Sequence, residues 1–182
     1  MVLSPICVDK SVENIPATPE ALLARLESLD INFELHKHRA VFSVAEADEI
    51  DRSIAGAHTR NLFVRDKKEN MFLITLLADT RIDLGKLAPL IGAGRLSFGS
   101  PERLMKNLGV SPGSVTPFAM INDRAHKVTL ILDKEMMESD IVNYHPLINT
   151  MTVSLTPDEL MTFLNDCNCK PKTMDLTPAR GA

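Results

Sequence analysis

Aromatic side chains are rare in this chain of 182 residues, which is 4% aromatic, with no tryptophan and a single tyrosine, Tyr144. Proteins that read single-stranded nucleic acid by stacking its bases usually present several aromatic rings. The core must therefore be built from Leu, Ile, Val, Met and Phe. If the protein recognises a nucleic acid, we expect backbone loops and a small pocket to do so, not stacked bases.

Long apolar runs are also missing, since none reaches the roughly 18 residues that a membrane-spanning helix needs. Residues 1–7 lack the basic and long apolar regions of a signal peptide. The three cysteines are an odd number, and one residue separates Cys167 from Cys169, so we expect no disulfide framework. These absences predict a cytoplasmic protein with no membrane partner.

The charge balance excludes further classes of protein. The chain has 20 Lys and Arg against 24 Asp and Glu, a net charge of -4, which rules out an indiscriminate basic coat for nucleic acid and gives no reason to expect DNA as a partner. A local basic face remains compatible with that charge. With 45% apolar and 24% charged residues, the composition is that of a globular protein of about one domain.

The hydrophobic pattern predicts an α/β fold of the α+β type, with a mixed, largely antiparallel sheet of about seven strands and flanking helices. Hairpins account for most of the expected strands, and a Ser or Thr followed by Pro opens three of the expected helices. The expected helices are 18–29, 44–50, 84–91, 101–108 and 156–164, and the expected strands are 33–38, 61–64, 71–77, 118–121, 127–132, 141–144 and 151–155.

Composition along the chain predicts three parts. Residues 1–17 are mixed and loop-like, and we interpret them as an N-terminal extension. Residues 18–169 carry all of the expected helices and strands and form the domain. Residues 170–182 are polar, contain two prolines and end in Gly-Ala, so we expect a loose tail there.

Most familiar catalytic patterns are not found. His36 and His38 alternate along one strand, but two imidazoles without a third nearby ligand are weak evidence for a metal, and the spacing of Cys167 and Cys169 is not that of a zinc site. The glycine-rich stretch 92–99 matches neither the dinucleotide fingerprint nor the phosphate loop, and no nucleophile elbow occurs. We therefore predict no metal and no cofactor.

Three polar features are more informative together than singly. Arg60 and Asn61 stand at the start of an expected strand, directly after a turn. The segment 113–117 is a shaped loop in which glycine permits close backbone approach and proline fixes the exit. His145 precedes Pro146, which confines the histidine to an extended conformation. Each of them alone has an ordinary structural interpretation.

Four ordered blocks of sequence contain these features: GAHTRNLFVRDKK at 56–68, LSFGS at 96–100, GVSPGSVTPF at 109–118 and YHP at 144–146. With them, the chain from about Thr18 to Cys167 resembles the YbaK and prolyl-tRNA-synthetase-associated editing-domain superfamily, in particular its free-standing ProX type. The resemblance implies a cytoplasmic aminoacyl-tRNA deacylase that maintains translation fidelity by hydrolysing the ester of mischarged Ala-tRNA(Pro).

The resemblance also implies which residues form the site. It assigns catalytic roles to Asn61 and His145, and to Arg60, which stands where the family has lysine and replaces a compact ammonium with a planar fork. Backbone groups of the 113–117 loop would hold the aminoacyl moiety, with the ribose hydroxyl of the substrate assisting attack by water. The expected substrate-binding residues are Phe98, Gly99, Gly113, Ser114, Val115, Thr116 and Pro117.

Two alternatives remain open. The lysine-to-arginine change allows a non-catalytic module that binds tRNA or aminoacyl-tRNA, and the substrate of a deacylase could instead be another misacylated tRNA, carrying Cys or Ser. The basic candidates for tRNA contact are 36–39 together with Arg65, Lys67 and Lys68. The oligomeric state is also open, with a homodimer as one alternative.

Overall fold

The computed structural model describes residues 15–39 and 53–181 of the chain. The helix expected at 44–50 and most of the expected extension at 1–17 lie outside these ranges. The described strands are β1 (Glu34–Lys37), β2 (Ala57–Arg65), β3 (Met71–Leu77), β4 (Ser97–Phe98), β5 (Val128–Asp133), β6 (Val142–Tyr144), β7 (Met151–Leu155) and β8 (Lys172–Met174). The described helices are α1 (Pro19–Ser28), α3 (Leu84–Leu90), α4 (Pro101–Leu108), α5 (Lys134–Met137) and α6 (Pro157–Asp166), with 3-10 turns η1 (Pro117–Asn122) and η2 (Thr177–Ala179).

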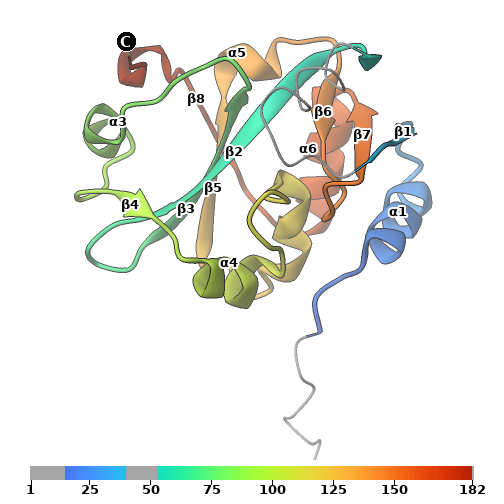
Figure 1. Ribbon diagram of the computed structural model, residues 1–182, viewed down its shortest axis with the longest axis horizontal. Coiled ribbons are helices and arrows are strands. Elements are labelled where there is room, and N and C mark those ends of the chain that lie inside the picture. Colours follow the sequence, from blue (N-terminus) through green and yellow to red (C-terminus); the bar gives the residue numbers. More distant parts are fainter. Residues whose placement is uncertain (1–14, 40–52, 182) are drawn as a thin grey trace, which may run out of the picture.

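The described strands form one mixed sheet in the order β1-β7-β6-β2-β3-β5-β8, with β4 paired to β2 (Figure 1). The β1–β7, β6–β7, β2–β3 and β2–β4 pairs are antiparallel, whereas β2–β6, β3–β5 and β5–β8 are parallel. The predicted fold class, an α+β domain with a mixed sheet and flanking helices, is thereby confirmed.

Two hydrophobic clusters hold the helices onto the sheet. The larger one packs α1, α4, η1 and α6 against the strands and includes Phe118, which makes edge contacts with the rings of Tyr144 and Phe163. The smaller one packs α3 and η2 through Leu87 and Leu176 against the other face of β2 and β3. Figure 1 shows α3 and the C-terminus at one end of the molecule and α1 at the other.

The predicted helix starts at the three Ser/Thr-Pro positions are confirmed. The hydroxyl of Thr18 accepts the backbone N–H of Ala21, and Ser100 caps α4 in the same way. At α6, Thr156 accepts the N–H of Glu159 while the Glu159 carboxylate accepts the N–H of Thr156, which completes a capping box. Local sequence alone therefore fixes where these helices begin.

The predicted hairpin of β2 and β3 is also confirmed, with Arg65 opposite Met71 at its closed end. The turn is held by the Asp66 carboxylate, which accepts hydrogen bonds from the backbone of Lys68 and from the backbone and side chain of Asn70. The bond from the Asn70 side chain is the main reason that the pKa of Asp66 lies below its usual value. The acidic residue of this turn is thus structural.

The second predicted hairpin, between 118–121 and 127–132, is wrong in its first strand. Residues 117–122 form η1, because Pro117 opens a turn in which Thr116 accepts the N–H of Phe118. Three consecutive side chains, Phe118, Ala119 and Met120, are buried together, a pattern that a strand with one wet face does not give. The strand β5 pairs with β3 in parallel instead.

The C-terminal segment, expected to be a loose tail, follows the sheet edge instead. Lys172–Met174 forms β8 beside β5, and the residues after it are held by backbone hydrogen bonds from Asp83 to Ala179 and from Gly181 to Arg81. Leu176 and Ala179 are fully buried in the smaller cluster. These two apolar residues anchor the segment to the domain, although the segment as a whole has a polar composition.

One edge of β2 is interrupted in a way that positions the site. β3 pairs with β2 from Thr59 to Arg65, and the opposite edge pairs with β6 at Ala57–His58 and with β4 at Val64–Arg65. Between these two partners, no strand among the described residues pairs with Thr59–Phe63 on that edge. We call this interval the β2 gap. Figure 1 shows β6 and β4 at opposite ends of β2.

Within residues 15–39 and 53–181, no helix has the length and apolar character needed to cross a bilayer.

Candidate functional site

A small cavity of about 50 Å³ lies at the β6 end of the β2 gap. We call it the Asn61 pocket. Three strands supply its walls, because β6 lies between β2 and β7 in the sheet. The lining residues are His58, Thr59 and Asn61 on β2, Asn143 and Tyr144 on β6, His145 directly after β6, and Thr152 on β7. The structure therefore brings together two of the three predicted catalytic residues, Asn61 and His145.

Asn61 presents a buried acceptor. Its Oδ1 atom is buried, yet it accepts no hydrogen bond from any residue that the structure describes. Buried polar atoms are nearly always hydrogen-bonded, because an unpaired one costs about 1–3 kcal/mol. The atom is thus suited to accept a hydrogen bond from an ammonium or hydroxyl group of a small molecule in the pocket.

His145 is held in one tautomer by the backbone. Its Nδ1 atom lies 2.8 Å from the carbonyl oxygen of Met151, and because a carbonyl can only accept, Nδ1 carries the proton. In the neutral ring, Nε2 is then the basic nitrogen. In the turn after it, the Leu147 N–H donates to the His145 carbonyl across Pro146, and Leu147 has a positive φ of 66°.

Hydroxyl and amide groups connect the pocket to the outer strands. The Ser154 hydroxyl donates to Asn143 Oδ1 at 2.5 Å and lies 3.0 Å from His36 Nε2. His38 Nε2 lies 3.0 Å from the hydroxyl of Thr152. The two histidines on β1 and its end thus bind hydroxyl groups, and in the described part of the chain no group of three or more His, Cys, Asp or Glu side chains could hold a metal.

Several lining residues were not found by sequence reasoning. Asn143 and Tyr144 directly precede His145, so their position could have suggested them, and Thr59 precedes the Arg60–Asn61 pair. Thr152 gives no signal in the sequence, because only the β6–β7 pairing brings it beside His145. Burial raises the pKa of the Tyr144 hydroxyl, which donates to the Met136 sulfur and stays protonated.

Arg60 is not brought into the pocket. Successive side chains of a strand point to opposite faces, so Arg60 leaves β2 on the side away from Thr59 and Asn61. Its guanidinium is exposed and reaches the carbonyl oxygen of Thr80, with 3.4 Å between Nη1 and that oxygen. The structure therefore places the predicted catalytic cation on the other face of the strand that carries Asn61.

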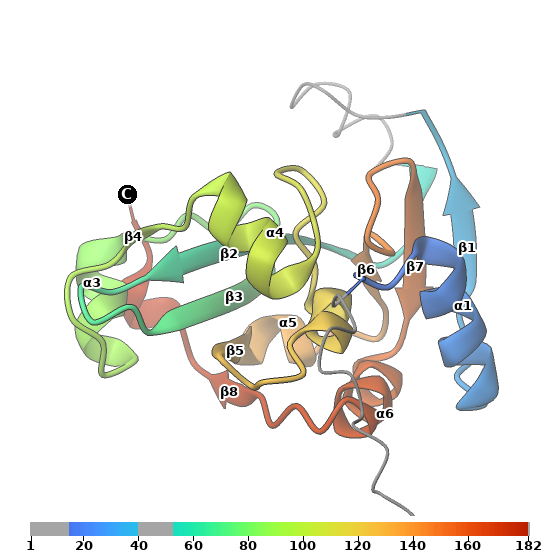
Figure 2. The ribbon, with the colours of Figure 1, turned by 90° about the horizontal axis from the view of Figure 1, so that it is seen from below.

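The predicted glycine loop lies next to the pocket without lining it. Gly113 has a φ of +88°, and a Cβ atom there would lie 3.9 Å from the side chain of Asn149, in the loop that follows His145. Figure 2 shows these two loops beside each other. Ser114, Thr116 and Pro117 are buried and Val115 is half-buried, so Gly113 is the accessible residue of the 113–117 loop.

Phe98 and Gly99 lie at the other end of the β2 gap, on and after β4. The backbone N–H of Gly99 donates to the carbonyl of Phe63 at 2.9 Å, and a Cβ atom at Gly99 would lie 2.4 Å from the Phe63 ring. Phe98 is 64% exposed. The structure separates these two residues from the Asn61 pocket by the length of the gap.

Neither described cysteine is a reactive group. Burial raises the pKa of the Cys167 thiol to about 12 and that of Cys169 to about 11. Both thiols are therefore protonated at neutral pH and are poor nucleophiles.

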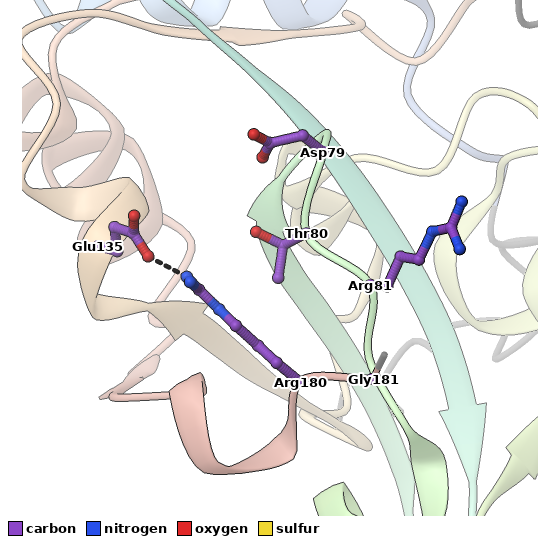
Figure 3. Close-up of a pocket in the computed structure, with 6 residues that line it drawn as sticks. All are labelled: Asp79, Thr80, Arg81, Glu135, Arg180 and Gly181. Carbon is purple, nitrogen blue, oxygen red and sulfur yellow. Dashed lines mark hydrogen bonds and ion pairs between the residues drawn. The ribbon is translucent and has the colours of Figure 1, made fainter.

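A second cavity, of about 270 Å³, lies where the C-terminal segment meets the loop after β3 (Figure 3). Glu135 and Arg180 form an ion pair across it, while the side chain of Arg81 points away from that pair (Figure 3). Thr80, whose carbonyl accepts from Arg60, and Asp79 form its other side. The mixed charges and the ion pair mark it as a structural junction between the C-terminal segment and the sheet.

The chain is similar in sequence to proteins of a known family. Residues 38–163 match the family model described as the aminoacyl-tRNA editing domain. The chain is 36% identical over 142 residues to "Prolyl-tRNA editing protein ProX" of Acetoanaerobium sticklandii, covering 78% of this chain and 87% of that protein. It is 35% identical over 157 residues to "Prolyl-tRNA synthetase associated domain-containing protein 1" of Xenopus laevis, covering 84% and 93%.

The fold is shared with solved structures. The crystal structure of hypothetical protein APE2540 superposes with a TM-score of 0.67 at 15% identity, covering 85% of this chain and 97% of that one. At this identity the likeness concerns the fold alone.

Proposed function

The chain belongs to the aminoacyl-tRNA editing domain family, and from this premise we propose that it is a trans-editing deacylase that hydrolyses the ester of Ala-tRNA(Pro). The membership and the likeness to a ProX protein support editing of an aminoacyl-tRNA in general. The choice of alanine as the amino acid, of tRNA(Pro) as the carrier and of the residues that act is our proposal.

The observation that carries the proposal is the unpaired, buried Oδ1 of Asn61 inside a small polar pocket. An aminoacyl ester has a free α-ammonium group, which donates hydrogen bonds. Bound there, the ammonium would satisfy the asparagine oxygen, and the ester carbon would lie beside the strand ends that carry His145 and Thr152. A substrate without this donor would leave a buried acceptor unpaired, which disfavours its binding.

The size of the pocket supports a small amino acid. A cavity of about 50 Å³ is small for a binding site, so a short side chain fits it more readily than a ring does. A synthetase site shaped for proline cannot strongly exclude the smaller alanine by binding alone, whereas a second site can select by being too small for the correct amino acid. Alanine therefore suits this pocket better than proline does.

The proposed chemistry requires no protein nucleophile. Water attacks the ester carbonyl, the bond from that carbon to the ribose oxygen breaks, and the products are free alanine and tRNA with its terminal hydroxyl restored. Backbone groups of the loop beginning at Gly113 would hold the aminoacyl moiety and polarise its carbonyl, while the neighbouring ribose hydroxyl of the substrate assists the water. His145, fixed through Nδ1, would form part of the wall against which the substrate is positioned.

Arg60 has a separate place in this proposal. Its exposed guanidinium leaves the same strand on the other face and would bind the phosphate of the terminal nucleotide as the RNA passes over the edge of β2. The contact with the Thr80 carbonyl would then be exchanged for a phosphate contact.

The test is hydrolysis of a panel of purified charged tRNAs by the full-length protein. We expect Ala-tRNA(Pro) to be deacylated well above the uncatalysed rate and Pro-tRNA(Pro) not to be. Equal, background-level release from both would contradict the proposal, and faster release of Cys or Ser would assign a different substrate. Tight binding without turnover, in both the natural protein and Arg60→Lys, would identify a non-catalytic aminoacyl-tRNA binding module.

A further inference from the structure

A basic groove lies at the β4 end of the β2 gap, beyond the proposed catalytic pocket. Its volume is about 280 Å³, and no acidic side chain is among its lining residues. We call it the basic groove, lined by Arg65, Lys67, Arg95, Leu96 and Ser97. Its place is fixed by pairing, because Ser97 on β4 lies directly opposite Arg65 on β2.

Nearby carboxylates do not neutralise the groove. Arg65 forms an ion pair with Glu69, with 3.0 Å between Nη1 and Oε1, but Glu69 also pairs with Arg103, so one carboxylate serves two guanidinium groups. Lys67 and Arg95 are exposed and form no ion pair with the residues that the structure describes. The groove thus keeps an excess of positive charge, as a binding site for phosphate groups would.

An exposed aromatic ring lies on β4, one residue after Ser97 of the groove wall. Phe98 is 64% exposed, although a phenylalanine normally gains about 1.5–3 kcal/mol by burial. Its backbone is pinned, because β4 places Phe98 opposite Val64 and the following residue bonds to Phe63. An exposed ring on the same short strand as the wall of a groove with exposed cations suits single-stranded nucleic acid, since bases stack on aromatic rings while phosphates contact cations.

The β2 gap lies between this surface and the Asn61 pocket. The pocket borders the gap at β6, and Phe98 borders it at β4, with the five residues Thr59–Phe63 between them. At about 3.3 Å per residue this interval is roughly 16 Å, which a short stretch of single-stranded RNA can span. An ester seated in the pocket leaves the preceding nucleotides to continue along the gap.

From these observations we infer that Phe98 and the basic groove form a docking surface for the single-stranded 3′ end of an RNA. Phe98 stacks on a base upstream of the terminal nucleotide, and Lys67 and Arg95, across β4 from the ring, bind backbone phosphates. The inference rests on the proposed function for the identity of the RNA as a tRNA end. It also revises the expectation, drawn from the scarcity of aromatics, that stacking has no part in recognition: one well-placed ring suffices.

The test measures binding of an uncharged RNA, which requires no ester hydrolysis. A fluorescein-labelled single-stranded RNA ending in CCA is titrated with the full-length protein, and fluorescence anisotropy gives the dissociation constant. Phe98→Leu should weaken binding about 5- to 100-fold, the range expected for one stacked base, while Phe98→Tyr keeps the ring and should bind as the natural protein does. Because Phe98 is exposed, neither change should affect folding.

The charged side chains are tested by their salt dependence. Lys67→Gln with Arg95→Gln should weaken binding and make the slope of log K against log salt shallower by about 0.7 for each lost phosphate contact. Lys172→Gln is the matched control, since Lys172 is exposed on β8, on the far side of β3 and β5 from the groove. It should change neither affinity nor slope.

Three results would overturn the inference. The first is unchanged binding by Phe98→Leu, and the second is loss of affinity in Lys172→Gln equal to that in the groove variant, which would indicate non-specific attraction. A blunt RNA duplex of the same charge should bind more weakly than the single strand, and equal, ring-independent binding of the two would also contradict the inference. If the natural protein binds in a ring-dependent way but deacylates nothing, the docking surface stands and the proposed function fails.

Discussion

At the scale of single residues, two neighbours in the sequence have opposite places in the structure. Asn61 contributes a buried, unpaired oxygen to the pocket, whereas Arg60 extends from the other face of β2 to the backbone of Thr80. The sequence could suggest both as site residues because they are adjacent polar groups at a strand start. It could not separate their roles, because that depends on which face of β2 meets the core.

The unpaired oxygen leads to a prediction that separates activity from stability. In Asn61→Ala, we expect kcat/KM for Ala-tRNA(Pro) to fall about 10- to 100-fold, the size of one hydrogen bond to a charged group. The free energy of unfolding should not fall through loss of a hydrogen bond, because Oδ1 accepts none in the folded protein. Deacylation kinetics and urea unfolding measure the two effects.

The matched control is Thr59→Val in the same pocket. The Thr59 hydroxyl donates to the Asn143 carbonyl at 2.7 Å, so its loss should lower the free energy of unfolding by about 1 kcal/mol. If Asn61→Ala left kcat/KM unchanged, or lost as much stability as Thr59→Val, the asparagine oxygen would have no part in binding substrate.

At the scale of elements, the sequence predicts those features that a few neighbouring residues determine. The Ser/Thr-Pro starts of α1, α4 and α6 and the β2–β3 hairpin were predictable, since capping and turn residues act within a few positions. The η1 segment was not, because its apolar run has no period that distinguishes a short strand from a buried turn. The segment forms a turn because Phe118, Ala119 and Met120 are all buried in the larger cluster.

The close packing of β4 against β2 makes the fold sensitive to a methyl group at Gly99. Gly99→Ala would place a methyl group 2.4 Å from an atom of the Phe63 ring, so the buried ring must move. We expect the free energy of unfolding to fall by about 1–3 kcal/mol, the usual cost of overpacking. Gly94→Ala is the control: its new methyl group would be no nearer than 3.8 Å to Asp66 and its φ is not positive, so stability should be unchanged. Equal unfolding curves for the two variants would show that β4 can move away from β2 without cost.

At the scale of the whole molecule, contacts between distant parts of the chain decide what the sequence did not reveal. Thr152 reaches the pocket only through the β6–β7 register, and the C-terminal segment is ordered only because β5 and α3 offer it a surface. Composition described residues 170–182 correctly as polar. It could not show that single apolar residues there, Leu176 above all, complete a cluster whose other members come from distant parts of the chain, such as Ile74, Leu87 and Ile131.

The C-terminal segment is therefore predicted to stabilise the fold. Leu176→Ala should lower the free energy of unfolding by about 2–5 kcal/mol, as for other fully buried leucines. Thr177→Ala, at the next and exposed position, should change it by no more than about 0.5 kcal/mol. Urea unfolding of both variants provides the comparison, and a Leu176→Ala protein as stable as the natural one would return this segment to the status of a loose tail.

The β2 gap has a further consequence, for association between molecules. An unpaired strand edge usually invites a strand from another copy, which leads to aggregation. Here β6 and β4 close the gap at both ends, so an incoming strand could not extend beyond the five residues Thr59–Phe63. The outermost strands, β1 with four residues and β8 with three, are short as well. Among residues 15–39 and 53–181, β2 can thus leave one edge unpaired in the middle of the sheet while the sheet offers other molecules no long edge to extend.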